Sequence, residues 1–217
     1  MNVLAFDCST SSCSAAVLAD DKVLAWRQVA MARGQAEVLL PMIVETLAEA
    51  GLTWAEINLI GVTVGPGTFT GLRIGLAAAR GMALASGLPL AGVTTCEAVA
   101  HATSAAERQG RTLVVAVDGK RADLFIQPFN ADLQPLAEAD AVMPEAVGAL
   151  VAGPFLLAGC GAARLAEALP EAVLSAACGA PDARVVARLA ARRWAEGRAL
   201  PPLPLYLRPP DVTLPSC

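Results

Sequence analysis

Apolar residues occur along the chain in two kinds of run, short continuous ones and longer ones with helical spacing. Short runs bounded by turn residues predict strands over 3–6, 13–19, 22–29, 59–64, 88–93, 113–118, 123–129 and 155–158. Apolar positions three and four residues apart predict helices over 35–50, 72–86, 94–106, 162–168 and 182–197. Strands and helices alternate in this order, which favours an α/β fold.

The order of elements repeats at about half the length of the chain. The first strand ends at Asp7 and a later one ends at Asp118, 111 residues further along a chain of 217. Each is followed by a turn and a second strand, and further on by a strand, glycines and a helix. This spacing predicts a duplicated α/β unit, with subdomains over 1–106 and 107–217 facing each other across a cleft. Asp7 and Asp118 should lie at the mouth of that cleft.

The most distinctive motif is the glycine-rich stretch from Gly65 to Gly75, GPGTFTGLRIG, which separates a predicted strand from a predicted helix. Such a loop can hold a phosphate, because unpaired backbone N–H groups gather at a helix N-terminus. Two nucleotide motifs do not fit. The stretch lacks the Gly-Lys-Ser/Thr ending of a Walker loop, and its third glycine comes one residue late for a dinucleotide fingerprint.

Small residues recur every four positions through this loop and the helix after it, so they lie along one side. They are Gly71, Gly75, Ala79, Ala83 and Gly87. A side without bulk lets another backbone approach closely. Two interpretations remain open: the side packs on the chain's own sheet, or it meets a helix of another chain. On the helix predicted at 35–50, Pro41 should introduce a kink or mark the true start.

Composition indicates a folded chain whose core consists of small side chains, since 55% of the residues are hydrophobic but only 4% are aromatic. The formal net charge of −4 differs from the basic surplus of an autonomous nucleic-acid binder. A nucleic-acid role would therefore need a partner that supplies positive surface. The six cysteines form no C-x-x-C motif, and no apolar run is long enough for a membrane span. We expect reduced cysteines and a cytoplasmic protein without a secretory leader.

Candidate chemistry is sparse. Asp7 and the hydroxyls of Ser9 and Thr10 could hold a metal-bound phosphate, or they could merely tie the first turn together. The single histidine, His101, lies one turn after Glu97 on a predicted helix and is expected to be structural. With one histidine and no H-E-x-x-H motif, we expect neither a zinc site built by the protein nor a Ser-His-Asp triad.

The last predicted helix, over 182–197, is basic and should present its arginines to solvent. Its buried side should carry Val185, Leu189 and Trp194. The proline-rich tail that follows cannot be helical and should lie extended, pinned by Tyr206 and Arg208.

The stretch from Gly65 to Gly75 closely resembles the GPGSFTGLRIG signature of the TsaB family, bacterial subunits that help to make threonylcarbamoyladenosine in tRNA. Three further segments resemble that family. The strand LAFDCST at 4–10 resembles its opening I-D-T-S, VDGKR at 117–121 its D-A-R-R, and LYLR at 205–208 its closing Y-L-R. The resemblance extends over most of the chain.

The resemblance implies a duplicated, ribonuclease H-like fold of the actin, sugar-kinase and heat-shock-chaperone type, with two mixed-sheet subdomains. It also implies a non-catalytic scaffold subunit that pairs with TsaD. In that system TsaD carries the ATP and metal site and transfers threonylcarbamoyl to the adenosine next to the anticodon, and TsaE, a small ATPase, binds the same assembly. The chain itself would need no cofactor or metal, would meet tRNA only through the complex, and would form a homodimer when alone.

The resemblance further implies that the helices over 35–50 and 71–85 form the pairing surface. The interface residues expected on this basis are Glu37, Leu40, Ile43, Leu47, Gly71, Leu72, Arg73, Gly75, Ala79, Met82 and Ala83.

The sequence departs from the family pattern at three places. Residues 35–37, QAE, stand where the family often has His-Ser-Glu, and Gly119 replaces an alanine. Cys8 stands where phosphate-binding relatives of this fold carry glycine, and its side chain should crowd a phosphate away from the backbone. The first and last of these departures favour a cleft that has lost nucleotide chemistry. Its remnants would be Asp7, Ser9, Thr10 and Asp118.

Two other functions stay open at this point. A small ATP-binding kinase or ATPase of the same fold could use the four residues just named, although the missing lysine and Cys8 argue against it. A peptidase is a further alternative, because relatives of this fold were once grouped as glycoproteases. His101, unassisted and without a metal motif, argues against that function.

Overall fold

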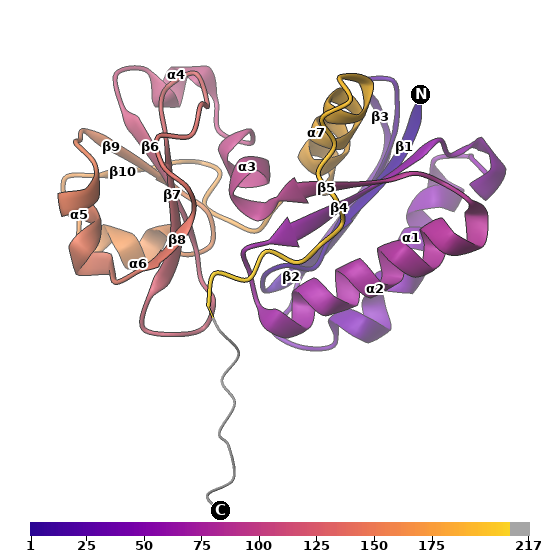
Figure 1. The fold of residues 1–217 in the computed structure, drawn as a ribbon, viewed down its shortest axis with the longest axis horizontal. Helices are drawn as coiled ribbons and strands as arrows, with labels where there is room; N and C mark the ends of the chain where they lie inside the picture. Colours follow the sequence, from indigo (N-terminus) through magenta and orange to yellow (C-terminus); the bar gives the residue numbers. More distant parts are fainter. Residues whose placement is uncertain (209–217) are drawn as a thin grey trace, which may run out of the picture.

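The computed structural model describes residues 1–208, which form two five-stranded mixed sheets with helices around them (Figure 1). The first sheet has the order β3-β2-β1-β4-β5 and the second β10-β9-β6-β7-β8. Among the described residues no helix combines the length and the apolar character that crossing a bilayer requires.

The two sheets have the same topology. In each, the first three strands are consecutive antiparallel neighbours, and the fourth and fifth add parallel to the outer side of the first. The first sheet contains β1 Asn2–Asp7, β2 Ser12–Ala19, β3 Lys22–Ala30, β4 Leu59–Gly65 and β5 Leu90–Thr94. The second contains β6 Thr112–Val117, β7 Leu124–Phe129, β8 Asp140–Val142, β9 Phe155–Ala158 and β10 Val173–Leu174. The predicted duplication is therefore confirmed.

Helices cover both faces of the first sheet because both faces are apolar. Alternate residues of β1 point to opposite sides, so Leu4 and Phe6 join one core and Val3 and Ala5 another. α1 Gln35–Glu49 and α2 Phe69–Ser86 pack on the first of these cores, and α7 Ala183–Ala195 packs on the second. Figure 1 shows α1 and α2 side by side on one face and α7 on the other.

Shorter helices surround the second sheet. α3 Thr95–Ala100 lies between the two sheets in Figure 1 and packs its apolar side on β6. The remaining short elements are α4 Ala105–Arg108, α5 Val147–Leu150, α6 Ala162–Ala166 and the 3₁₀ turns η1 Trp54–Glu56 and η2 Pro144–Ala146.

Three details differ from the sequence prediction. The helix expected over 94–106 is two helices, because Ser104 and Glu107 form a capping box that starts α4. Pro41 lies inside α1 and does not mark its start. Trp194 is 44% exposed and does not belong to the buried side of α7, which is formed by Ala183, Val186, Ala187, Leu189 and Ala190.

The two sheets are not separated by a single cut of the chain. The boundary proposed between residues 106 and 107 falls inside α4, and α7 returns from the second half to cover the first sheet. After α7 the chain crosses between the sheets again as an extended segment, residues 199–208, which we call the strap (Figure 1).

Candidate functional site

Asp7 is the most deeply buried acidic residue of the predicted cleft. Its side chain has no exposed surface, and Oδ1 accepts hydrogen bonds from Ser9 Oγ at 2.5 Å, Thr63 Oγ1 at 2.6 Å and Ser9 N at 3.0 Å. Oδ2 is buried and accepts no hydrogen bond from the residues that the structure describes. Burial raises the pKa of the Asp7 carboxyl, and the hydrogen bonds from Ser9 and Thr63 oppose that rise. The geometry fits a tied turn that is closed to solvent.

The glycine loop lies directly on this turn. Thr68 N donates to Ser9 O at 2.8 Å, and a Cβ added at Gly67 would overlap the same carbonyl oxygen. A Cβ added at Gly71 would overlap the carbonyl oxygen of Cys8. Glycine is therefore required at both positions by backbone packing within the chain. The two segments that could each have held a phosphate instead contact each other through their backbones.

Cys8 is placed differently from the prediction. Its side chain is buried in the core beneath α2, where its Sγ lies 3.1 Å from Cys13 Sγ, and Gly75 lies above it. The expectation that this side chain crowds a phosphate is wrong, because it points away from the cleft into the core. The Cys8 backbone carbonyl, against Gly71, is the group that closes the space.

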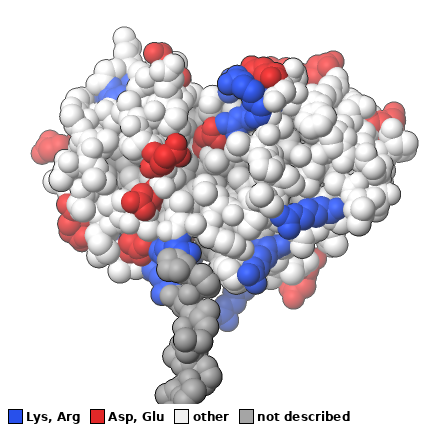
Figure 2. Space-filling model, in the orientation of Figure 1, with Lys and Arg blue, Asp and Glu red and all other residues white. Residues whose placement is uncertain are grey.

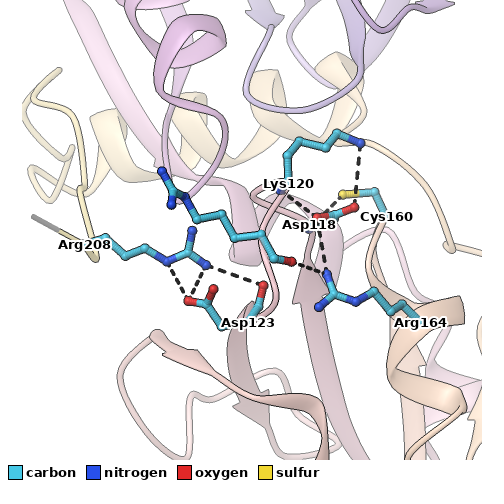
Figure 3. Close-up of polar contacts among 7 residues, drawn as sticks. Asp118, Lys120, Asp123, Cys160, Arg164 and Arg208 are labelled. Atoms are coloured by element: carbon cyan, nitrogen blue, oxygen red, sulfur yellow. Dashed lines mark hydrogen bonds and ion pairs between the residues drawn. The ribbon is translucent and has the colours of Figure 1, made fainter. Parts of the chain in front are cut away.

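Asp118 belongs to a separate cluster on the second subdomain. Its Oδ1 accepts from Lys120 N at 2.7 Å, and its carboxylate lies 3.7 Å from both Lys120 Nζ and Arg164 Nη1. The backbone N–H of Asp118 donates to Cys160 Sγ at 3.3 Å. Figure 3 shows these groups converging at the end of β6. The structure thus holds Asp7 and Ser9 together, with Thr10 buried in the same turn, and it pairs Asp118 with Lys120 and Arg164. The carboxylates of Asp7 and Asp118 both act electrostatically on the thiol of Cys160.

The strap closes the groove between the subdomains. Leu200 O accepts from Gly92 N at 2.8 Å, and Leu205 N donates to Val64 O at 2.7 Å, so the strap is fixed to the first sheet. Beyond these bonds Arg208 pairs with Asp123 of the second subdomain, with 2.6 Å between Arg208 Nε and the carboxylate (Figure 3). The prediction that Arg208 pins the tail is confirmed for residues 199–208, while residues 209–217 of the predicted tail lie outside the described residues.

Tyr206 is the other predicted pin, and it also contacts the body of the protein. Its hydroxyl accepts a hydrogen bond from Arg73 Nε at 3.2 Å, and its ring lies 5.4 Å from that of Phe69. The Arg73 guanidinium stacks over the Phe69 ring at 3.7 Å. Sequence reasoning named Tyr206 but did not predict that α2 would provide its partners.

A cavity of about 500 Å³ lies under the strap, between the glycine loop and the turn after β6. It is lined by Gly67, Phe69, Arg73, Gly119, Arg121, Phe125, Leu205, Tyr206, Leu207 and Arg208. Sequence analysis missed this site, because its walls come from three segments far apart in the chain and no motif spacing connects them.

The helices of the expected pairing surface turn their small-residue side inward. Ile43, Leu47, Gly71, Leu72, Gly75 and Ala79 are buried within the subunit. A second chain cannot touch these side chains in this structure, because they pack on the chain's own sheet. Of the two interpretations of the small-residue stripe, close packing on the sheet is the one observed over Gly71–Gly75–Ala79. Glu37, Leu40 and Arg73 are exposed, and Met82 and Ala83 are partly buried.

The outward side of the same two helices carries exposed apolar residues beside charged ones. Leu40 is 50% exposed, Val44 57% and Leu84 88%. A hollow of about 460 Å³ opens at the end of α2, lined by Trp54, Ala55, Met82, Ala85 and Ser86. We call the surface formed by Leu40, Val44, Leu84 and this hollow the α1–α2 face. Single exposed leucines are ordinary on a protein surface, whereas several exposed apolar residues and a hollow on two neighbouring helices mark a candidate binding surface.

His101 has a structural environment. It lies at the end of α3, where its backbone N–H donates to Glu97 O at 2.9 Å. Burial and the nearby Arg192 guanidinium lower the pKa of its imidazole. In the part of the chain that the structure describes, no hydrogen bond connects its ring to a serine, threonine or cysteine, which a catalytic role as a base would use.

Known proteins resemble this chain in sequence. The family model described as TsaD, tRNA N6-adenosine threonylcarbamoyltransferase, matches residues 29–152, more than half of the chain. An uncharacterized protein of Mycobacterium tuberculosis is 35% identical over 214 residues, which cover 97% of this chain and 93% of that protein. The tRNA threonylcarbamoyladenosine biosynthesis protein TsaB of Escherichia coli is 34% identical over 133 residues, which cover 61% of this chain and 56% of that protein.

Solved structures resemble it over nearly its whole length. YeaZ from Pseudomonas aeruginosa superimposes with a TM-score of 0.79 at 27% identity and covers 95% of this chain and 99% of that one. An activator of 2-hydroxyisocaproyl-CoA dehydratase from Clostridium difficile shares the fold alone, with a TM-score of 0.53 at 11% identity. The fold is a duplicated α/β fold with two mixed-sheet subdomains, as predicted. The chain therefore belongs to the TsaD family and is a homologue of the TsaB proteins that serve threonylcarbamoyladenosine biosynthesis in tRNA.

Proposed function

We propose that the chain is a non-catalytic scaffold subunit that pairs with a TsaD protein, and through that assembly with TsaE. The assembly would transfer threonylcarbamoyl to the adenosine next to the anticodon of tRNA. The name of the Escherichia coli relative supports involvement in this modification, although the alignment spans little more than half of that protein. We place this work in the cytoplasm, where tRNA is modified.

The observation that carries the proposal is the α1–α2 face. Leu84, 88% exposed, stands on a helix whose other side is fully engaged with the core. Leu40 and Val44 extend the apolar surface onto α1, and the hollow beside Trp54 offers a pocket for a side chain of a partner. Apolar anchors around a pocket are the usual centre of a protein–protein interface.

The closed turn supports a non-catalytic role. A phosphate-transfer site needs carboxylates that can reach a metal ion and backbone N–H groups open to phosphate. Asp7 has no exposed surface, and the N–H of Thr68 is used by Ser9 O. Asp118 is held by Lys120 and Arg164. We infer that these residues shape the first turn and the domain junction and leave the chemistry to the partner.

Pairing can be tested with one substitution and a matched control. Leu84→Asp places a charge at the most exposed leucine of the α1–α2 face, and Leu136→Asp places one at a leucine that is 53% exposed near the second sheet. The wild-type chain and L136D should form a heterodimer with purified TsaD in analytical ultracentrifugation. The L84D variant should bind at least roughly tenfold more weakly, as for the loss of an interface anchor.

The same samples test the state of the chain alone. We expect a homodimer of the wild-type chain that L84D converts to monomer, because both pairings would use the α1–α2 face. If the wild-type chain does not bind TsaD, the scaffold proposal fails. If L84D and L136D bind TsaD equally well, pairing takes place elsewhere on the surface.

A further inference from the structure

The cavity under the strap combines aromatic rings with guanidinium groups. Phe69, Phe125 and Tyr206 line it together with three arginines. Its volume of about 500 Å³ lies within the range of about 300–1,000 Å³ that small-molecule sites occupy. Such a combination suits a ligand that has both a flat ring and a negative charge, because rings stack on the aromatics and arginine binds phosphate.

Three of the residues that line the cavity are arginines, although the formal net charge of the chain is −4. Arg208 is neutralised by Asp123. Arg73, by contrast, meets neutral groups among the described residues, the hydroxyl of Tyr206 and the ring of Phe69. Two helical turns further along α2, Arg80 Nε donates to the carbonyl oxygen of Pro202 at 3.1 Å, so the partner of Arg80 is also a neutral group. Figure 2 shows several Lys and Arg side chains on the lower part of the face that it draws.

We infer that this cavity binds one nucleotide of single-stranded RNA, with the base against the aromatic rings and the phosphate at Arg73. The inference rests on the proposed function, in which the substrate is a tRNA. It revises the expectation that the partner supplies all the positive surface. Single strands are the form of RNA whose bases are free to enter a pocket and stack on aromatic side chains.

A free nucleoside phosphate shares this chemistry, but the surroundings favour RNA. Free nucleoside di- and triphosphates are commonly bound with a magnesium ion that carboxylates hold. Asp7 is closed off from solvent, and Asp118 is engaged by Lys120 and Arg164. The cavity therefore offers aromatic rings beside arginines, and binding to these groups requires no metal ion. An RNA strand bound there could continue over Arg80.

The test uses the full chain alone and a short fluorescent RNA without secondary structure, with binding measured by anisotropy at several salt concentrations. The same RNA as a duplex and AMP serve as competitors. We expect the single strand to bind at low salt, the duplex to compete at least about tenfold more weakly, and AMP to compete poorly because it lacks the neighbouring phosphates.

Variants separate the two parts of the site. Arg73→Gln should weaken binding about five- to tenfold and reduce the slope of log affinity against log salt by about 0.7, the contribution of one phosphate on a single strand. Arg188→Gln on α7 removes the same charge far along the chain, beside Asp21, and should change little. Phe69→Ala should weaken binding about tenfold with the salt slope unchanged, and Phe69→Tyr should restore it.

Several results would overturn the inference. They are absence of binding at low salt, equal losses for R73Q and R188Q, equal binding of the duplex, or displacement by AMP as effective as by RNA. The last result would assign the cavity to a free nucleotide. Any of these leaves the scaffold proposal intact if the wild-type chain still pairs with TsaD, because that pairing is measured without RNA and through Leu84.

Discussion

The glycines of α2 allow a sharp test of how this helix is packed. Gly71, Gly75 and Gly81 lie on the same helix, but a methyl group would meet different surroundings at each. At Gly71 it would overlap the carbonyl oxygen of Cys8 and lie 2.6 Å from Thr68 Oγ1. At Gly75 the nearest atoms would be 3.8 Å and 3.9 Å away, which is ordinary van der Waals contact, and at Gly81 nothing lies within 4 Å.

Gly71→Ala should therefore destabilise the protein strongly. The Thr68 side chain can rotate, but the Cys8 carbonyl follows β1, which is paired with strands on both sides. Relief of the overlap must displace the backbone of the helix or the turn, and the hydrogen bond from Thr68 N to Ser9 O is lost as well. We expect a loss of about 3–5 kcal/mol in the free energy of unfolding.

Gly75→Ala and Gly81→Ala should have the opposite sign. Alanine favours a helix interior over glycine by about 1 kcal/mol, and neither methyl group is obstructed. Urea denaturation followed by circular dichroism should show G81A more stable by about 0.5–1 kcal/mol, with a rise in melting temperature of about 1–4 °C. Gly75→Leu, in contrast, would overfill the core above Cys8, so its loss of stability would report on packing within the subunit.

The refuting result is simple to recognise. If G71A is as stable as G81A, the glycine loop does not lie on the first turn as described. If G75A keeps its stability but loses pairing with TsaD while G81A does not, the small-residue side of the helix faces a partner after all, and the outward α1–α2 face is not the interface.

Three further outcomes follow from particular contacts. Because burial raises the folded pKa of Asp7 above its ordinary value of 3.8, its contribution to stability is complete below that pH and is lost as the pH rises through the folded pKa. Asp7→Asn should flatten this fall in urea titrations between pH 4 and 8, and an unchanged profile would exclude Asp7 as its source. His101 acts in the reverse direction: its pKa is lowered from 6.5, so stability should decrease as the pH falls below that value, and His101→Gln should remove the decrease. Gly92→Ala would bring a methyl group within 2.9 Å of Pro201 O and so push against the strap. Hydrogen exchange at the Leu205 amide should become faster, with a loss of about 1–3 kcal/mol in the free energy of opening the strap. Protection equal to wild type would show that the strap is not held there.

The fold could be predicted largely because the same order of strands and helices occurs twice in the sequence. Asp7 and Asp118 each close a strand that starts the same five-stranded order. The break between α3 and α4 was missed although its signal was present, since Ser104 and Glu107 are a capping box inside a continuous helical pattern. Alanine-rich spacing concealed that break, because alanine fits a helix interior on either side of the cap.

The candidate site was less accessible to sequence reasoning. A stripe of glycine and alanine is compatible with contact to a sheet or to a second helix, so spacing alone could not orient Gly75 or Ala79. Trp194 was assigned to the core by hydrophobicity, but the crowded space over β1 and β4 accepts only small and branched side chains of α7. The cavity under the strap depends on how the last described residues cross back between the sheets, and no local pattern records such a path.

The return of α7 to the first sheet has a consequence for how the protein is made. Val3, Ala5 and Leu18 leave the ribosome well before the helix that covers them, which follows more than 160 residues later. Until then one side of the amino-terminal sheet remains bare, however complete α1 and α2 are on the other. Maturation of this half must therefore wait until α7 has been translated, and a fragment that stops before residue 183 should be insoluble without a chaperone.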